Sequence, residues 1–325
     1  MVDRMQIARA RVVLPKAVQR WIYDPNVTLV GLAWPEKNGQ LDESTVAIRF
    51  HVRSKFQQGI QLESAIDRKA THDEIPEEID GIPTDVVQAR YKLHQFWTGW
   101  NRATTNQRAK ACNPIRCGVS IGSERSYGSG TLGGLVKDRQ TGEAMCLSNW
   151  HVLVGDWGIR PPQRIFQPGR LDGGNSTHTF AILKRDAMND NLDAAVASLS
   201  GQRQWINEQM DLWPVHGKSQ VALGMEVVKS GYNSKVTRGR VTLIDAVVKI
   251  PYKGQTRLIR SVFVVDQLSP HTTISGPGDS GSLWLNPVTH DAVGLHFAGS
   301  NQPEQALAMD IQAVLDALQV DLITS

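Results

Sequence analysis

The chain is poor in cysteine and lacks any long apolar run. Its three cysteines (Cys112, Cys117 and Cys146) form an odd set without zinc-site spacing. We expect reduced thiols in a cytoplasmic protein, with a Cys112–Cys117 pair under oxidation as the alternative. No apolar run approaches the roughly 20 residues that cross a bilayer, and residues 1–6 lack the layout of a signal peptide. We therefore expect no membrane partner, no metal and no cofactor.

An excess of charge of one sign is also missing. The 35 Lys and Arg residues nearly balance 32 Asp and Glu residues, for a net charge of +3. Residues 1–95 carry 13 of each sign, and residues 96–325 carry 22 basic against 19 acidic residues. A nucleic-acid-binding surface needs a concentration of basic charge that this chain does not have. A composition with 41% hydrophobic and 21% charged residues indicates a globular protein that does not bind nucleic acid.

Residues 1–95 read as a small α/β domain. Residues 5–22 have helical spacing and end before a proline. Residues 27–34 and 44–52 are β-rich and flank a turn, so they predict a hairpin. Residues 58–67 favour a helix, and residues 81–87 a short final strand.

A linker and a β-rich domain follow. Residues 96–117 carry Phe96, Trp97 and Trp100, which would expose apolar surface unless the linker packs against the protein. In residues 118–325, short apolar runs alternate with Gly, Asp and Asn turns, which is typical of a β-barrel or sandwich. The expected strands span 130–136, 144–148, 194–199, 225–229, 240–248, 261–265, 282–285 and 292–297, and a last helix spans 310–318.

Residues 276–282 read Gly-Pro-Gly-Asp-Ser-Gly-Ser and contain the most informative serine, Ser280. Runs of this composition are usually loops. Glycines on either side nevertheless let backbone N–H groups approach a substrate closely. A serine nucleophile also needs a base and a group that orients the base.

His151 and Asp193 are the candidates for those two roles. His151 follows the apolar run 145–148, at what we expect to be the end of a strand, and a structural histidine is the alternative. Asp193 opens the apolar run 194–199, where burying a carboxylate is costly unless it is paired. The order His151, Asp193, Ser280 matches one of the known Ser-His-Asp arrangements, with intervals of 42 and 87 residues.

These motifs together resemble the trypsin-like, chymotrypsin-fold serine proteases. The matching segments are residues 128–133, 147–152, 191–199, 276–283 and 293–299. Residues 75–86 resemble the N-terminal domain of intracellular bacterial proteins related to the plant narrow-leaf protease. The resemblance implies a mainly β fold, a double β-barrel preceded by a small N-terminal α/β domain. It also implies Ser280 as nucleophile, His151 as base and acid, Asp193 as its orienter, and an oxyanion hole from the N–H groups of Gly278 and Ser280.

The resemblance also implies which residues line the pocket for the side chain before the cut. They are Ile274, Ser275, His296, Phe297, Ala298 and Gly299. Ile274 falls where trypsin has its pocket aspartate, so Lys/Arg specificity is not expected. His296 can donate a hydrogen bond to a carboxylate or amide, which predicts cleavage after Glu or Gln, with a structural histidine as the alternative. No zymogen-type Ile-Val-Gly-Gly sequence is present, so activation by a new N-terminus that pairs with Asp279 is not expected.

The sequence therefore predicts a serine endopeptidase that acts on proteins or peptides. The alternative is a latent or partner-gated module that keeps the protease fold and works by binding. In both cases, residues 1–95 suit homo-oligomerisation, binding of a regulatory protein or gating of the active site, with a packed stabilising extension as the alternative. Residues 128–133 also match G-x-G-x-x-G, but a strand rather than a helix is expected after them, which argues against a nucleotide site.

Overall fold

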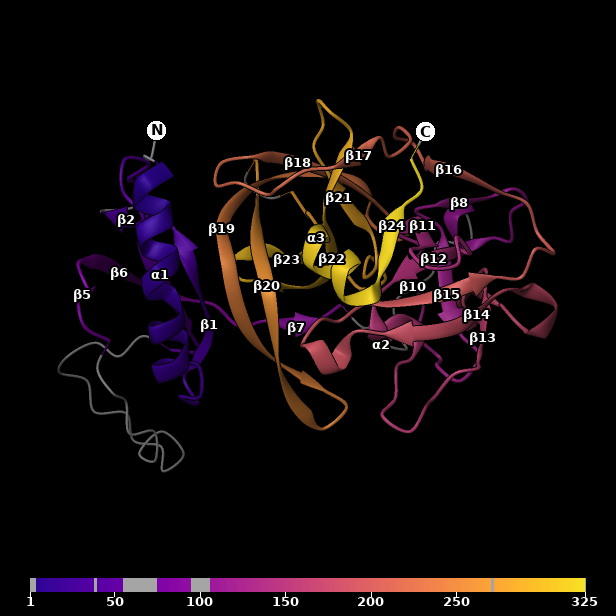
Figure 1. Cartoon of the computed structure of the whole chain (residues 1–325), viewed down its shortest axis with the longest axis horizontal. Coiled ribbons are helices and arrows are strands. Elements are labelled where there is room, and N and C mark those ends of the chain that lie inside the picture. The colour runs from indigo at the N-terminus through magenta and orange to yellow at the C-terminus, as the bar shows by residue number, and fades with distance from the viewer. Residues whose placement is uncertain (1–3, 38–39, 55–74, 95–105, 270–271, 325) are drawn as a thin grey trace.

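The N-terminal residues build one helix against a small sheet (Figure 1). The structure is a computed structural model that describes residues 4–37, 40–54, 75–94, 106–269 and 272–324. Helix α1 (Arg4–Trp21) buries Ala10, Leu14, Ala17 and Trp21 along one face, at the spacing that brings side chains together on a helix. The strands are β1 (Val27–Ala33), β2 (Glu36–Lys37), β3 (Gln40–Leu41), β4 (Ala47–Val52), β5 (Glu78–Ile79) and β6 (Ile82–Gln88).

The expected hairpin is formed by β1 and β4, which pair antiparallel from Val27 opposite Val52 to Ala33 opposite Ala47. Both strands are buried along their whole length, because α1 packs on one side of them and other strands adjoin them. Strand β1 also pairs with a long strand of the β-rich region, with Leu29 opposite Val248. The N-terminal sheet is thus continuous with that region. The helix expected over 58–67 and the aromatic cluster Phe96, Trp97 and Trp100 lie outside the described residues.

Six strands of the C-terminal β unit close into a ring. The strand order β18-β21-β22-β23-β20-β19 returns to its start because β18 also pairs with β19. Their bounds are β18 (Glu226–Gly231), β19 (Lys235–Tyr252), β20 (Gln255–Gln267), β21 (Leu283–Leu285), β22 (Asp291–Asn301) and β23 (Glu304–Asp310). Two short strands, β7 (Lys92–Leu93) and β17 (Gly217–Lys218), also pair with β22.

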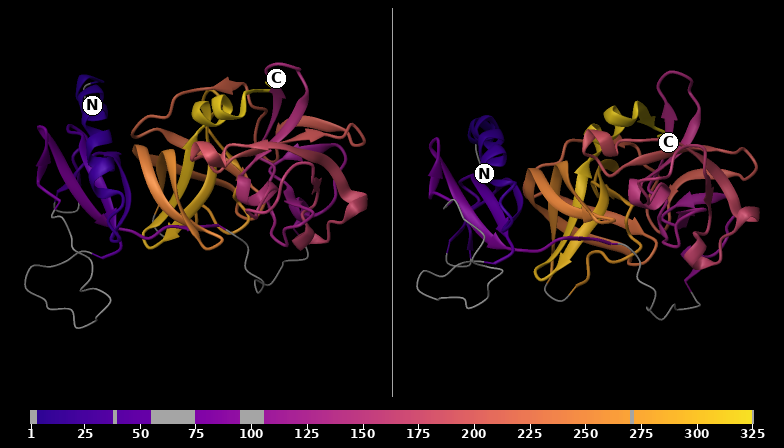
Figure 2. Two further views of the ribbon diagram at one scale, coloured as in Figure 1. Left: turned by 60° about the horizontal axis from the view of Figure 1, so that its bottom comes forward. Right: turned by 90° about the horizontal axis from the view of Figure 1, so that it is seen from below.

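The other β unit is an eight-stranded curled sheet with the order β10-β9-β13-β14-β15-β12-β11-β24. Its strands are β9 (Ser120–Ser123), β10 (Gly130–Thr131), β11 (Gly134–Asp138), β12 (Ala144–Ser148), β13 (Arg164–Phe166), β14 (Thr179–Asp186), β15 (Ala195–Leu199) and β24 (Val320–Leu322). Strands β8 (Ile115–Cys117) and β16 (Trp205–Gln209) form a separate parallel pair. The expected last helix is α3 (Ile311–Leu318). Figure 2 shows the two β units side by side, with the N-terminal unit beyond the ring of β18–β23.

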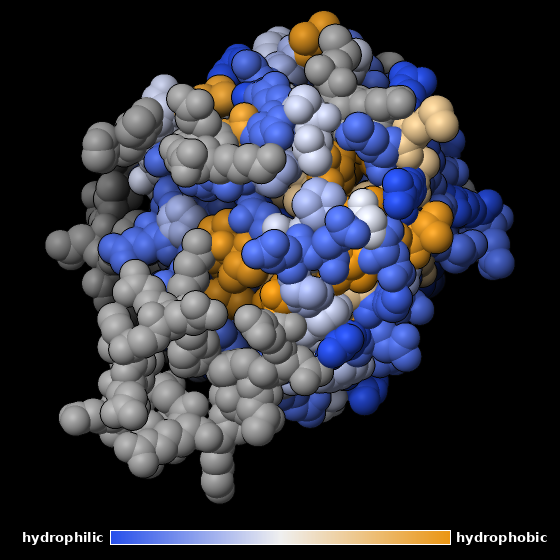
Figure 3. Space-filling model, turned by 90° about the vertical axis from the view of Figure 1, so that its left-hand side faces the viewer, coloured by the Kyte–Doolittle hydropathy of each residue, from blue (hydrophilic) through white to orange (hydrophobic). Residues whose placement is uncertain are grey.

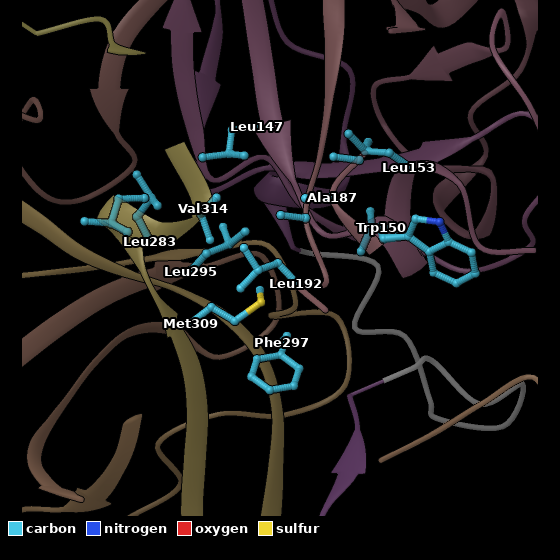
Figure 4. Packing of buried hydrophobic residues seen from close by; sticks show 14 of the residues in the cluster. Leu147, Trp150, Leu153, Ala187, Leu192, Leu283, Leu295, Phe297, Met309 and Val314 are labelled. Atoms are coloured by element: carbon cyan, nitrogen blue, oxygen red, sulfur yellow. The ribbon is translucent and has the colours of Figure 1, made fainter. Parts of the chain in front are cut away.

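A single apolar core joins the two β units. Leu147 and Leu153 of the first unit pack in the same cluster as Leu295 and Met309 of the second (Figure 4). Dense packing across this boundary fixes the position of one unit against the other. The predicted fold class is confirmed in its main features: the protein is mainly β, with two β units, one a closed ring and one a curled sheet, and an α/β segment before them.

The outer face of the N-terminal unit is mostly hydrophilic where its residues are described (Figure 3). Hydrophobic side chains appear there in scattered groups between polar ones. Among the described residues, no helix combines the length and the apolar character needed to cross a membrane.

Candidate active site

His151 and Asp193 lie together because two neighbouring strands end beside each other. Strands β12 and β15 pair antiparallel with Ser148 opposite Ala195, so the short segment that follows β12 lies beside the segment that leads into β15. His151 lies on a short helix, α2 (Trp150–Leu153), rather than at the strand end that the sequence suggested. Its Nδ1 atom is 2.6 Å from Oδ2 of Asp193, and its backbone N–H donates to Oδ1 at 3.0 Å. Two hydrogen bonds to one carboxylate hold the imidazole in a single orientation.

The Asp193 carboxylate is completely buried and accepts a further hydrogen bond. Tyr252, at the end of β19, donates its hydroxyl to Oδ2 at 2.9 Å. Burial, and then the Asp193 charge, raise the pKa of Tyr252 well above its usual value, so it remains a donor. The Asn149 side chain donates to the Asp193 backbone carbonyl at 2.7 Å. A buried carboxylate needs such partners to remain ionised.

This arrangement determines which nitrogen of His151 can act as a base. A carboxylate only accepts hydrogen bonds, so Nδ1 carries the hydrogen and Nε2 has a free lone pair in the neutral ring. No described residue makes a hydrogen bond to Nε2. His151 thus presents a basic nitrogen that is not used by the surrounding fold.

Ser280 lies on a tight turn between β20 and β21. Gly278 has φ of 100°, a conformation that favours glycine, and a Cβ there would lie 2.7 Å from the Tyr232 ring. The Gly278 carbonyl accepts from the Thr131 hydroxyl at 2.9 Å, and the Gly278 N–H donates to the backbone carbonyl of His94 at 3.2 Å. The Ser280 hydroxyl donates to the carbonyl of Phe297 at 3.1 Å. In this structure it does not donate to His151.

A buried ion pair fixes this turn. Lys229 Nζ lies 3.0 Å from Asp279 Oδ2, and neither side chain is exposed. The same carboxylate accepts the backbone N–H groups of Asn233, Ser234 and Gly276. Burial would raise the pKa of Asp279, but Lys229 and Ser234 outweigh it and the pKa is lowered. Asp279 therefore has an internal cationic partner in Lys229.

The predicted pocket residues are all close to the turn, but they contribute differently. Ile274 and Ser275 are buried before it, and Ile274 uses its backbone, donating to Glu304 and accepting from Thr237. Phe297 turns its side chain into the core (Figure 4) and offers only its carbonyl. The other predicted members on β22 are His296, Ala298 and Gly299.

His296 is completely buried and is in contact with His94, a residue that no motif indicated. His296 Nε2 lies 3.2 Å from His94 Nδ1. Burial lowers the pKa of His94 to about 4, and that of His296 well below its usual value, so both rings are neutral near pH 7. His94, Lys229 and Tyr252 could not be recognised in the sequence, because each is far from the motif residues that it contacts.

A cleft of about 250 Å³ lies beside His94 and His151. Its lining includes His94, His151 and Val152, together with residues 126–129. A larger cavity of about 610 Å³, lined by Lys218, Asp245 and other residues, has no lining residue in common with this cleft. Within the described ranges, His, Cys, Asp and Glu side chains form no group that could hold a metal ion.

Comparisons with known proteins find similarity in structure only. No protein-family model and no curated protein matches the sequence. A Nocardiopsis protease superposes with a TM-score of 0.49 at 15% identity, over 65% of this chain and 99% of the other. A glutamic acid-specific serine protease that uses a histidine triad in substrate binding superposes with a TM-score of 0.47 at 16% identity, over 64% of this chain and 100% of the other. Cellulomonas bogoriensis chymotrypsin superposes with a TM-score of 0.45 at 15% identity, over 65% of this chain and 100% of the other.

Because these similarities are remote, the function proposed below rests on contacts within this chain. The closer resemblance to narrow-leaf-related proteins stays a prediction.

Proposed function

We propose that the protein is a serine endopeptidase in which Ser280 is the nucleophile. The observation that carries this proposal is the buried Asp193 carboxylate, which holds Nδ1 of His151 at 2.6 Å and leaves Nε2 free. An orienting carboxylate behind an imidazole is the arrangement that activates a serine. The buried carboxylate behind Nδ1 distinguishes His151 from His51 and His296, which are buried histidines that also have a ring nitrogen without a partner but lack such a carboxylate.

The proposed reaction begins when the Ser280 hydroxyl rotates away from the Phe297 carbonyl towards His151. Nε2 takes the hydroxyl proton while Oγ attacks the carbonyl carbon of the substrate. The oxygen becomes negative and is stabilised by the N–H groups of Gly278 and Ser280. Removing one such donor typically costs roughly 100- to 1000-fold in rate.

His151 then acts as an acid. It gives its proton to the leaving amine as the carbon–nitrogen bond breaks, which leaves an ester on Ser280. Water, deprotonated by the same imidazole, hydrolyses the ester and restores the enzyme. Asp193 stays ionised throughout and stabilises the imidazolium, while Tyr252 and the backbone N–H of His151 keep the carboxylate in place.

Replacing the nucleophile tests the proposal. Ser280→Ala is expected to lower the hydrolysis of an unfolded protein substrate to background, because the hydroxyl that forms the acyl-enzyme is gone. Ser200→Ala, at an exposed position, serves as the matched control and is expected to behave as the wild type. Equal hydrolysis by Ser280→Ala and wild type would contradict the proposal. A natively folded wild type that hydrolyses no substrate, yet binds a partner through the cleft, would support the binding-module alternative.

For specificity, we propose cleavage after residues whose side chains hydrogen-bond to a neutral imidazole. No acidic residue occurs among the proposed pocket residues, which disfavours Lys and Arg. His296 Nε2 faces the position that the His94 ring fills. A Glu carboxylate or a Gln amide could accept a hydrogen bond there. A peptide-library profile dominated by Leu or Phe before the cut would overturn this proposal.

A further inference from the structure

The edge of β22 that lies beside Ser280 is already paired with the chain's own residues. Strand β7 runs antiparallel to it, with Lys92 opposite Gly299 and Leu93 opposite Ala298. An extended peptide that binds to a protein often does so by adding a strand to a sheet edge. Residues 92–94 thus lie as a substrate strand would, and the chain runs along them towards the turn of Ser280.

The carbonyl of His94 lies where a scissile carbonyl is expected. It accepts the backbone N–H of Gly278 at 3.2 Å, and that N–H is a proposed donor to the developing oxyanion. His94 also lines the same cleft as His151. The His94 carbonyl is therefore held by a proposed oxyanion donor, on a residue that shares a cleft with the proposed base.

The His94 ring occupies the place proposed for the side chain before the cut. It is 3% exposed and contacts His296 through Nδ1. It also lies against Gly299, since a Cβ on that glycine would be 2.6 Å from His94 Cε1. Leu93 is 8% exposed, whereas the Lys92 side chain points to solvent. His94 and Leu93 are thus buried against the protein, and Lys92 faces solvent.

The segment that precedes His94 is anchored on both sides. The Ala89 carbonyl accepts from the Thr28 hydroxyl at 3.0 Å, and the Tyr91 hydroxyl donates to Gln305 at 2.6 Å. The pairing of β1 with β19 holds the whole N-terminal unit against the ring of β18–β23. Such tethering gives a reactant a high effective concentration at the site.

We propose that the peptide bond on the carboxyl side of His94 is a self-cleavage site, with Lys92-Leu93-His94 bound as the acyl part of an intramolecular substrate. This inference rests on the proposed function. Ser280 Oγ bonds to the His94 carbonyl carbon as its proton passes to His151. The bond to the next nitrogen then breaks as His151 protonates that nitrogen. Water finally hydrolyses the ester and leaves a carboxylate on His94.

Intact mass measured under denaturing conditions tests the proposal. Purified full-length wild type is expected to convert into fragments 1–94 and 95–325, and Ser280→Ala is expected to remain whole. The conversion should be first order and independent of protein concentration, because the reacting groups belong to one chain. The fragments should co-elute under native conditions, since the β1–β19 pairing does not involve the broken bond.

Two leucine variants sharpen the test. Leu93→Asp buries a carboxylate beside Ala298 and is expected to slow the cut by roughly tenfold or more. Leu268→Asp, the matched control, makes the same change at an exposed leucine outside the bound segment and should keep the rate within about twofold. Labelling of Ser280 by a small fluorophosphonate should persist in Leu93→Asp, which shows that this variant folds and keeps its nucleophile.

The outcomes separate this inference from the proposed function. A chain that stays intact, while Ser280 labels and cuts added peptides, overturns the self-cleavage site only. A cut whose rate rises with protein concentration, or one that falls elsewhere in the chain, also overturns it. The absence of both labelling and peptide hydrolysis in the folded protein would instead contradict the proposed function.

Discussion

The two β units differ in whether their proposed catalytic groups already make the hydrogen bonds that the reaction needs. The eight-stranded unit supplies His151 and Asp193, already hydrogen-bonded to each other at 2.6 Å. The closed ring supplies Ser280 and Gly278, whose hydrogen bonds go elsewhere: the hydroxyl to Phe297 and the N–H to the carbonyl of His94. The acid–base half is thus assembled, whereas the nucleophile half is engaged with the protein's own chain.

The difference follows from what holds each half. Paired strands bring His151 and Asp193 together, and a buried carboxylate with several donors leaves them no alternative arrangement. The Ser280 turn is equally well fixed through Asp279 and Lys229, but its hydroxyl can still rotate. The fold therefore fixes the position of the His151 ring, whereas the direction of the Ser280 hydroxyl depends on what occupies the cleft.

Breaking the acid–base half should have the largest effect. Asp193→Asn offers an amide in place of the carboxylate and can favour the wrong tautomer of His151, so kcat/KM is expected to fall by roughly 10⁴-fold. Peptide hydrolysis measures the effect, and circular dichroism checks the fold. Asp190→Asn, an exposed change on the preceding turn, is the control and should have no effect on rate. Full activity in Asp193→Asn would mean that Asp193 does not orient the base.

Breaking the support of the nucleophile half should destabilise the protein. Lys229→Met leaves the buried Asp279 carboxylate without its cation, which typically costs about 3–5 kcal/mol in the free energy of unfolding. Lys184→Met removes a surface pair with Glu143 and should cost less than about 1 kcal/mol. Denaturant unfolding compares the two variants.

Adding Asp279→Asn to Lys229→Met should recover part of the loss, because the unpaired charge is removed. If Lys229→Met costs no more than Lys184→Met, then the buried pair does not fix the Ser280 turn.

A smaller effect is expected from Tyr252→Phe. The change removes one hydrogen bond to the Asp193 carboxylate but leaves the two bonds from His151. A hydrogen bond to a charged group contributes about 1.5–3 kcal/mol, so kcat/KM should fall by roughly tenfold. Tyr23→Phe, the same change at an exposed tyrosine, is the matched control and should leave kcat/KM unchanged. A loss as large as that of Asp193→Asn would indicate that Tyr252 does more than support the carboxylate.

The smallest perturbation is a pH titration that follows the His94 ring, which lies beside the Ser280 turn. The His94 ring should titrate with a pKa of about 4, because burial opposes its protonation. Asp279 raises this pKa, whereas Lys229, Lys92 and the neighbouring His151 lower it. If the His94 ring left the cleft, it would take up a proton near its ordinary pKa of 6.5. Binding of the ring in the cleft should therefore strengthen as pH rises from about 4 to 6.5.

NMR of the imidazole Cε1–H signals in Ser280→Ala, which stays whole, can follow this titration, and His94→Gln assigns the signal. A midpoint near 6.5 would place the ring in solvent and contradict its burial in the cleft.

Local pattern was enough to predict much of this protein. The strand 144–148 coincides with β12, the last helix coincides with α3 except for its cap, and the hairpin of β1 and β4 follows from two β-rich runs around a turn. His151, Asp193 and Ser280 could be selected because each lies in a short motif, and their order along the chain restricted the possible combinations.

Contacts between distant segments could not be predicted in the same way. Lys229 precedes its partner Asp279 by 50 residues, and His94 is 202 residues from His296. Neither residue stands in a distinctive local sequence, and only the closure of the ring brings these partners together. The continuity of β1 with β19 likewise depends on a sheet edge that no single segment reveals.

The most direct test of the central claim is to map a fluorophosphonate adduct on the native protein by tandem mass spectrometry. The wild type is expected to carry the adduct on Ser280, and His151→Ala is expected to lose most of it, because the hydroxyl is then no longer deprotonated. An adduct absent from Ser280 in both the folded wild type and Leu93→Asp would contradict the assignment of Ser280 as an activated nucleophile.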